Sequence, residues 1–112
     1  MEKIAFFAFR GDSTCFVHVM LNALDYHAKN IDVKVILEGE AVGMIKEMRE
    51  KGNKLFEQLE DKDLIDGVCR GCSATLGFLD YNEMSGIRLL DDMNGHPAMS
   101  SYSNRGYTII TL

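Results

Sequence analysis

The sequence predicts a single α/β domain over residues 1–112, with a five-stranded, mostly parallel sheet and helices on both of its faces. The length of 112 residues is that of one domain, and an apolar fraction of 46% with a charged fraction of 26% is typical of a globular chain that buries a core. Along the chain, short apolar segments of strand length alternate with longer amphipathic segments. This alternation favours right-handed βαβ units, because parallel strands need a crossover connection.

The first elements follow directly from the hydrophobic pattern. Residues 3–9 (KIAFFAF) are apolar on both faces, which is typical of a central strand in a covered sheet. A turn follows, in which Asp12 or Ser13 caps a helix over residues 14–29. Residues 31–37 (IDVKVIL) alternate and then become wholly apolar, which predicts a second strand.

The rest of the chain continues the alternation. Gly52 ends one amphipathic helix, and Pro97 suits the first position of another. The strand that contains Asp66 and Gly67 is weak, because both residues are poor strand formers. The further helices expected are residues 40–51, 53–61, 73–82 and 97–104. The further strands expected are residues 64–68, 87–90 and 107–112.

We expect the strand order 2-1-3-4-5 of flavodoxin-like folds, since it is common among doubly wound sheets. Ligands of such sheets bind beyond the carboxyl ends of the strands where the order reverses, here between the first and third strands. The loops after the first, third and fourth strands would then line one crevice with Arg10, Asp12, Cys15, Cys69, Cys72 and His96. Glu38 ends the second strand away from this crevice, and we expect it to act as a helix cap.

Charge and cysteine content exclude several classes of protein. Twelve Lys and Arg against 17 Asp and Glu leave a net charge of −5, so we expect no nucleic-acid binding by this chain on its own. No segment reaches the roughly 18 apolar residues of a membrane span, and the start lacks a signal-peptide pattern, so we expect a cytoplasmic protein without membrane association. An odd number of cysteines, three, does not form a disulfide framework.

The Cys69-x-x-Cys72 pair lies between an expected strand and an expected helix. The helix dipole and the charge of Arg70 both favour the thiolate, which is the form that attacks sulfur. Two other interpretations stay open. The cysteines are ordinary residues, one of them buried, or they form a zinc site whose further ligands are Cys15 and His96.

His96 lies between Gly95 and Pro97, so its backbone is stiff. An imidazole in this place can orient a substrate or move a proton. The alternative is a histidine that only caps the following helix.

Residues 68–76 (VCRGCSATL) resemble the DsrE/DsrF-like family, whose members carry a cysteine after the third strand. Cys72 takes the position of that cysteine and Thr75 that of a following threonine, whereas Ala74 stands where asparagine is common. Residues 95–110 are similar to the last helix and strand of the family. The resemblance covers nearly the whole chain in order and length.

This resemblance implies a flavodoxin-like fold, a homo-oligomer (dimer, trimer or hexamer) and sulfur transfer through a persulfide, without a cofactor. By this resemblance Cys72 would carry the persulfide. Cys69 has no fixed counterpart in the family, and we expect it either to resolve the persulfide as a disulfide or to shield it. From its position in the expected crevice, we expect His96 to assist proton movement. The partners would be a sulfur donor and a sulfur acceptor protein. The substrate-binding residues expected are Arg10, Asp12, Cys15, Arg70 and Thr75.

Two alternatives to sulfur transfer remain. The first is a dithiol redox module or a zinc-bound regulatory module that uses Cys69 and Cys72. The second is an oligomeric binding protein without catalytic activity, whose cysteines are incidental. Whether the protein is an enzyme stays open at this point.

Overall fold

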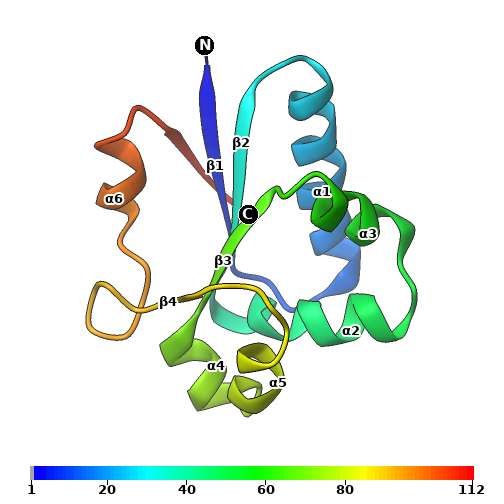
Figure 1. The fold of residues 1–112 in the computed structure, drawn as a ribbon, viewed down its shortest axis with the longest axis vertical. Helices are drawn as coiled ribbons and strands as arrows, with labels where there is room; N and C mark the ends of the chain where they lie inside the picture. The colour runs from blue at the N-terminus through cyan, green and yellow to red at the C-terminus, as the bar shows by residue number, and fades with distance from the viewer. Residues whose placement is uncertain (1) are drawn as a thin grey trace.

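The computed structural model describes residues 2–112 and contains a five-stranded sheet in which every pairing is parallel (Figure 1). The predicted α/β class with a mostly parallel sheet is confirmed. Apolar segments of strand length form the strands where the hydrophobic pattern places them. The strands are β1 (Lys3–Ala8), β2 (Asp32–Leu37), β3 (Ile65–Cys69), β4 (Leu89–Leu90) and β5 (Thr108–Thr111).

The strand order is β4-β3-β2-β1-β5, so the predicted order 2-1-3-4-5 is wrong. The physical reason lies in β2, whose last three residues, Val35, Ile36 and Leu37, are fully buried and belong in the middle of a sheet. The chain runs outward from β1 to β4 and then returns to place β5 beside β1. The order therefore reverses between β1 and β5, not between β1 and β3.

Helices form in the expected segments, with differences at their bounds. α4 (Arg70–Leu76) begins three residues earlier than expected, and Pro97 lies outside α6 (Met99–Ser103), which begins after the N-cap Ala98. The expected helix over residues 40–51 begins as a 3-10 turn, and the expected helix over 73–82 is divided at Gly77, which takes a left-handed φ of 83° and ends the first part. The helices are α1 (Ser13–Ala28), η1 (Gly39–Gly43), α2 (Met44–Glu50), α3 (Lys54–Asp61), α4 (Arg70–Leu76), α5 (Leu79–Glu83) and α6 (Met99–Ser103).

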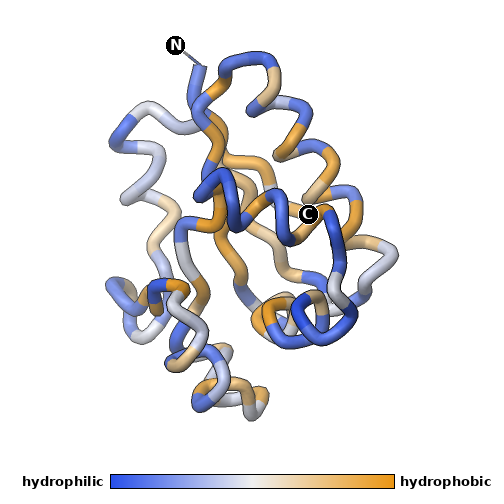
Figure 2. The backbone as a smooth tube through the Cα atoms, turned by 45° about the vertical axis from the view of Figure 1, so that its right-hand side comes forward, coloured by the Kyte–Doolittle hydropathy of each residue, from blue (hydrophilic) through white to orange (hydrophobic). Residues whose placement is uncertain are grey.

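The larger core lies between one face of the sheet and the helices α1, α2 and α3. α1 buries Phe16, Val19, Met20 and Ala23, and the rings of Phe16 and Phe56 lie 6.3 Å apart. Figure 2 shows the apolar strands at the centre and polar stretches along the outer sides of the helices. Within residues 2–112, none of the helices combines the length and apolarity that a membrane span requires.

The second face of the sheet carries a smaller core under α6. Phe7 packs edge-to-face on Tyr102, with ring centroids 5.4 Å apart, and Ala5 and Ile36 lie in the same cluster. Tyr102 donates its hydroxyl hydrogen to Asp66 of β3. The expectation of helices on both faces is confirmed. The helices are divided unequally: among residues 2–112, α6 covers this face, because the chain returns from β4 to β5 in the opposite direction and the crossover stays right-handed.

Candidate functional site

The Cys69-x-x-Cys72 pair forms the junction between β3 and α4. Cys69 is the last residue of β3 and the N-cap of α4, with an extended backbone (φ −63°, ψ 121°). Its Sγ accepts a hydrogen bond of 3.3 Å from the backbone N–H of Cys72, in the place where serine or aspartate usually caps a helix. This cap places both sulfur atoms on the same side of the junction, with Cys69 buried and Cys72 half-buried.

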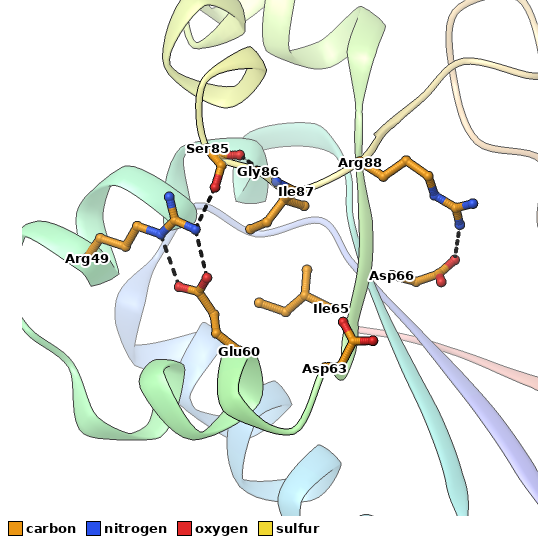
Figure 3. Close-up of a pocket in the computed structure, with 9 residues that line it drawn as sticks. All are labelled: Arg49, Glu60, Asp63, Ile65, Asp66, Ser85, Gly86, Ile87 and Arg88. Carbon is orange, nitrogen blue, oxygen red and sulfur yellow. Dashed lines mark hydrogen bonds and ion pairs between the residues drawn. The ribbon is translucent and has the colours of Figure 1, made fainter.

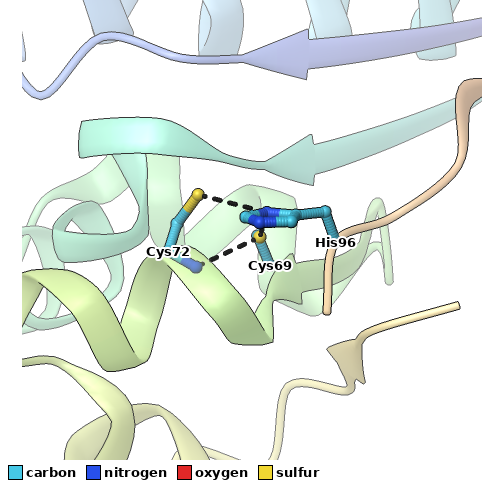
Figure 4. A group of neighbouring side chains, drawn as sticks. All are labelled: Cys69, Cys72 and His96. Carbon is cyan, nitrogen blue, oxygen red and sulfur yellow. Dashed lines mark hydrogen bonds between the residues drawn. The ribbon is translucent and has the colours of Figure 1, made fainter. Parts of the chain in front are cut away.

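His96 reaches the two cysteines from the loop that follows β4 (Figure 4). Its Nδ1 atom lies 2.9 Å from Sγ of Cys69 and 3.6 Å from Sγ of Cys72. The backbone of His96 is held by reciprocal hydrogen bonds with Met93, at 2.7 and 3.0 Å. Because β3 and β4 are neighbours, the ends of these strands bring the three side chains together.

Gly71 fixes the distance between α4 and the histidine loop. Its backbone N–H donates a 2.7 Å hydrogen bond to the carbonyl of Gly95. A Cβ atom at position 71 would lie 2.8 Å from that carbonyl oxygen and 2.9 Å from Cε1 of His96. Only glycine allows the two backbones to approach this closely. The glycine between the two cysteines is therefore what lets His96 lie against the start of α4.

The two thiols have different environments. Burial raises the pKa of Cys69 to about 12, against a smaller lowering by the Cys72 backbone N–H. Cys69 therefore keeps its proton at neutral pH and can donate it to His96 or to the Gly95 carbonyl, which lies 3.8 Å away. Cys72 is half-buried and is the thiol of this pair that solvent reaches.

Glu38 belongs to this site, which the sequence interpretation missed. It follows β2 and is only 8% exposed; burial raises the pKa of its carboxyl group, and the charge of His96 lowers it. The same carboxylate contributes to the raised pKa of Cys69. The predicted order placed β2 away from β3, whereas β2 lies beside it. Glu38 occupies the N-cap position of η1, but its side chain makes no capping hydrogen bond.

Three predicted site residues lie elsewhere, after β1. Asp12 caps α1 by accepting a 2.8 Å hydrogen bond from the N–H of Thr14, and Sγ of Cys15 lies 3.7 Å from its carboxylate. Arg10 and Cys15 line a cavity of only about 10 Å³. Their placement in one crevice with the other cysteines is wrong, because β2 separates β1 from β3.

Arg70 and Thr75 are both exposed on α4. The guanidinium group of Arg70 lies 4.0 Å from the carboxylate of Glu83 on α5, so its charge is shared with an acidic partner. Neither Arg70 nor Thr75 forms a hydrogen bond with either sulfur atom.

A buried network of hydrogen bonds fixes the backbone of Cys69. Ser73 donates a 2.7 Å hydrogen bond from Oγ to the carbonyl of Cys69, and Asn82 donates to Oγ of Ser73 at 2.9 Å and to the carbonyl of Val42 at 3.0 Å. Within residues 2–112, Oδ1 of Asn82 is buried without a hydrogen-bond partner. No sequence pattern marks these residues, because their contacts join separate elements.

A separate cavity of about 260 Å³ lies at the other end of β3 (Figure 3). Arg49 forms a two-pronged pair with Glu60, at 3.0 and 2.7 Å, and donates at 2.9 Å to the carbonyl of Ser85. Arg88 pairs with Asp66 at 2.9 Å. These charges neutralise one another and tie α2, α3 and β3 to the segment before β4, so we interpret this region as structural.

The fold and the site define a small α/β protein with a Cys-Cys-His cluster at the carboxyl end of its parallel sheet. The chain belongs to the same family as the uncharacterized protein MJ0733 of Methanocaldococcus jannaschii. The two are 32% identical over 120 residues, which cover 98% of this chain and 95% of the relative. No family model matches the chain, and no solved structure matches it.

Proposed function

We propose that this protein is a sulfur carrier, in which Cys72 accepts a sulfane sulfur atom as a persulfide and passes it to an acceptor thiol. The observation that carries the proposal is the position of Cys72: its Sγ is half-buried and lies 3.6 Å from Nδ1 of His96. A thiol that solvent reaches, beside a group that can take its proton, has the arrangement of an activated nucleophile.

The loading step transfers one sulfur atom from a donor persulfide. Cys72 gives its proton to His96 and attacks the terminal sulfur of R–S–SH. A new S–S bond forms on Cys72, the S–S bond of the donor breaks, and the donor leaves as R–S⁻, which takes the proton back from His96. The balance is R–S–SH + Cys72–SH → R–SH + Cys72–S–SH.

His96 accepts this proton in the tautomer that leaves Nδ1 free of hydrogen. The hydrogen bond from Gly71 to Gly95 holds the imidazole against α4, so the acceptor atom is positioned before the donor arrives. Proton transfer by a positioned side chain typically contributes about 10²–10⁴-fold to a rate.

Cys69 stays protonated because of its burial, which favours transfer of the sulfur atom outward over internal attack. Internal attack would follow Cys72–S–SH + Cys69–SH → Cys69–S–S–Cys72 + H₂S. In that reaction Cys69 would be the resolving cysteine, and the Cys69–Cys72 disulfide that it leaves is the oxidised form that a dithiol redox module would use.

The resemblance of residues 68–76 to the DsrE/DsrF-like family supports the choice of Cys72 and not Cys15 as carrier. We also propose, as that resemblance implies, a cytoplasmic homo-oligomer that meets separate donor and acceptor proteins. Leu76, one turn after Cys72, and Met93, which pairs with His96, are exposed apolar side chains beside the site where such a partner would dock.

The test is intact-protein mass spectrometry of reduced, chelator-treated protein after incubation with a small persulfide donor. We expect the wild type and the control variant Cys15→Ser to gain the mass of one sulfur atom, which a reductant removes. We expect Cys72→Ser to gain none. Sulfur uptake by Cys72→Ser equal to that of the wild type would overturn the proposal.

A further inference from the structure

We propose that Cys69, Cys72 and His96 form a Zn²⁺ site with three protein ligands and one coordination position left for a small external ligand. The proposal does not rest on sulfur transfer, because it needs only the arrangement of the two sulfur atoms and Nδ1. These three ligand atoms all lie within 4.8 Å of one another, and they come from the β3–α4 junction and from the loop after β4, at one end of the sheet (Figure 4).

One of the two sulfur–nitrogen separations already matches that of a tetrahedral zinc ion, and the other is close to it. Zn–S bonds of about 2.3 Å and Zn–N bonds of about 2.0–2.1 Å place sulfur and nitrogen about 3.5 Å apart. Sγ of Cys72 and Nδ1 of His96 are 3.6 Å apart, which satisfies this spacing without movement. Sγ of Cys69 is 2.9 Å from Nδ1, so it must move outward by roughly 0.6 Å to join the ion.

Protein contacts alone hold the start of α4 and the histidine loop in place. Gly71, between the two cysteines, donates a 2.7 Å hydrogen bond to Gly95, next to the histidine. Ser73 anchors the carbonyl of Cys69 at 2.7 Å. The ligands are therefore brought together before any ion binds, so little ordering of the chain opposes binding.

The charges of the cluster suit a divalent ion in a buried place. Binding follows Zn²⁺ + two Cys–SH + His → complex + 2 H⁺, because only thiolates coordinate. Two thiolates and a neutral imidazole give a complex with no net charge, which lowers the penalty of burying the ion beside the fully buried Cys69. Thiolate and imidazole are also the ligands that zinc prefers over oxygen-binding cations.

The number of ligands separates this site from a structural zinc site. Structural sites are closed by four protein ligands, whereas three leave a position for water or a substrate. The fourth ligand considered from the sequence, Cys15, lies outside the cluster and contacts Asp12 instead. The external ligand we infer is a small thiol or sulfide, since sulfur is a favoured donor to zinc.

Glu38 is the candidate outer partner of the metal-bound histidine. It is buried, and it directly follows Leu37, which pairs with Val68, so it lies at the end of the sheet where Cys69 ends β3. The charges of Glu38 and His96 also act on each other. A carboxylate beside a metal-bound imidazole strengthens the ligand, and its loss typically lowers metal affinity by about 10–100-fold. We expect Glu38→Gln to weaken zinc binding within this range.

The test is titration of reduced, chelator-treated protein with Co²⁺ as a spectroscopic substitute for zinc, followed by competition with Zn²⁺. We expect one equivalent to bind, with the thiolate-to-cobalt absorption of a tetrahedral site. We expect Cys72→Ser and His96→Asn each to lower the affinity by more than about 100-fold, which exceeds the loss of an outer partner. Circular dichroism would show that the variants are folded.

The matched controls are Cys15→Ser and His18→Asn, which remove a cysteine and a histidine of α1 outside the cluster and should bind the ion as the wild type does. Absence of binding at one equivalent would overturn the proposal. An affinity unchanged in His96→Asn would do the same. The titration contains no sulfur donor and the sulfur-loading test contains no metal, so each can fail without the other.

Discussion

Substitution of Gly71 by alanine tests whether close packing of α4 on the histidine loop sets the reactivity of Cys72. The added methyl group would lie 2.8 Å from the Gly95 carbonyl oxygen and 2.9 Å from Cε1 of His96. Ordinary contacts between heavy atoms are about 3.5–4.0 Å, so the loop must retreat by roughly 0.6 Å or more. The imidazole would then move away from both sulfur atoms.

The expected loss of stability combines two opposing effects. Inserting a methyl group into a packed region costs about 1–3 kcal/mol. Replacing glycine by alanine in a helix returns up to about 1 kcal/mol. We expect Gly71→Ala to lower the free energy of unfolding by about 1–2 kcal/mol in urea denaturation. We expect alkylation of Cys72 by iodoacetamide, followed by mass spectrometry, to slow markedly at the same time.

Gly77→Ala is the matched control. Gly77 has a left-handed φ of 83° and no neighbour within 4 Å of an added Cβ. Alanine there should cost a similar free energy, about 1–2 kcal/mol, through backbone strain, but it should leave Cys72 reactivity unchanged. Wild-type stability together with wild-type alkylation of Cys72 in Gly71→Ala would refute the packing account.

Three further outcomes are expected. The pKa of the Cys69 thiol is about 12 in the folded protein, whereas the ordinary thiol value is 9.0. The free energy of unfolding should therefore fall as the pH rises from 9.0 to about 12, because the unfolded chain loses this proton first. In urea unfolding at several pH values, Cys69→Ser should lack this decrease. Burial raises the pKa of Glu38, so the free energy of unfolding should also fall as the pH rises above the ordinary carboxyl value of 4.5. Glu38→Gln should remove this pH dependence and be more stable than the wild type at neutral pH. An unchanged pH profile in Glu38→Gln would contradict a raised pKa for this carboxyl group. Arg49→Lys loses the two-pronged pair with Glu60 and should lower the free energy of unfolding by about 1 kcal/mol without changing Cys72 alkylation; slower alkylation would show that the two ends of β3 are coupled.

The type and extent of most elements could be predicted because these depend on local periodicity. The order of the strands depends on which distant segments pair, and hydrophobic periodicity does not contain that information. Residues 31–37 carried the one usable signal, since a strand that ends wholly apolar belongs inside the sheet and not at its edge.

The wrong order had unequal consequences for the site. Both the predicted and the observed orders place the third and fourth strands side by side, so the meeting of Cys69, Cys72 and His96 was predicted and is confirmed. Cys15 would have joined them only if β1 bordered β3. Glu38 was missed for the converse reason, because β2 does border β3.

The weak strand signal at Asp66 and Gly67 has a tertiary explanation. A Cβ at position 67 would lie 2.5 Å from Cγ of Leu90, so glycine admits the side chain of β4. Asp66 accepts hydrogen bonds from Tyr102 and Arg88 on the second face of the sheet. Strand propensity underestimates this strand, because contacts with neighbouring elements, and not local preference, explain why these two residues occur in it.

The measurement that tests the sulfur-carrier role most directly is a single-turnover transfer. Metal-free protein loaded with one sulfur atom is separated from the donor and mixed with a small acceptor thiol. We predict that Cys72–S–SH + R–SH → Cys72–SH + R–S–SH returns the protein to its original mass, more slowly in His96→Asn, while the acceptor gains sulfane sulfur. A protein two hydrogen atoms lighter than its reduced form, with H₂S released and no sulfur on the acceptor, would contradict the account and show a Cys69–Cys72 disulfide switch.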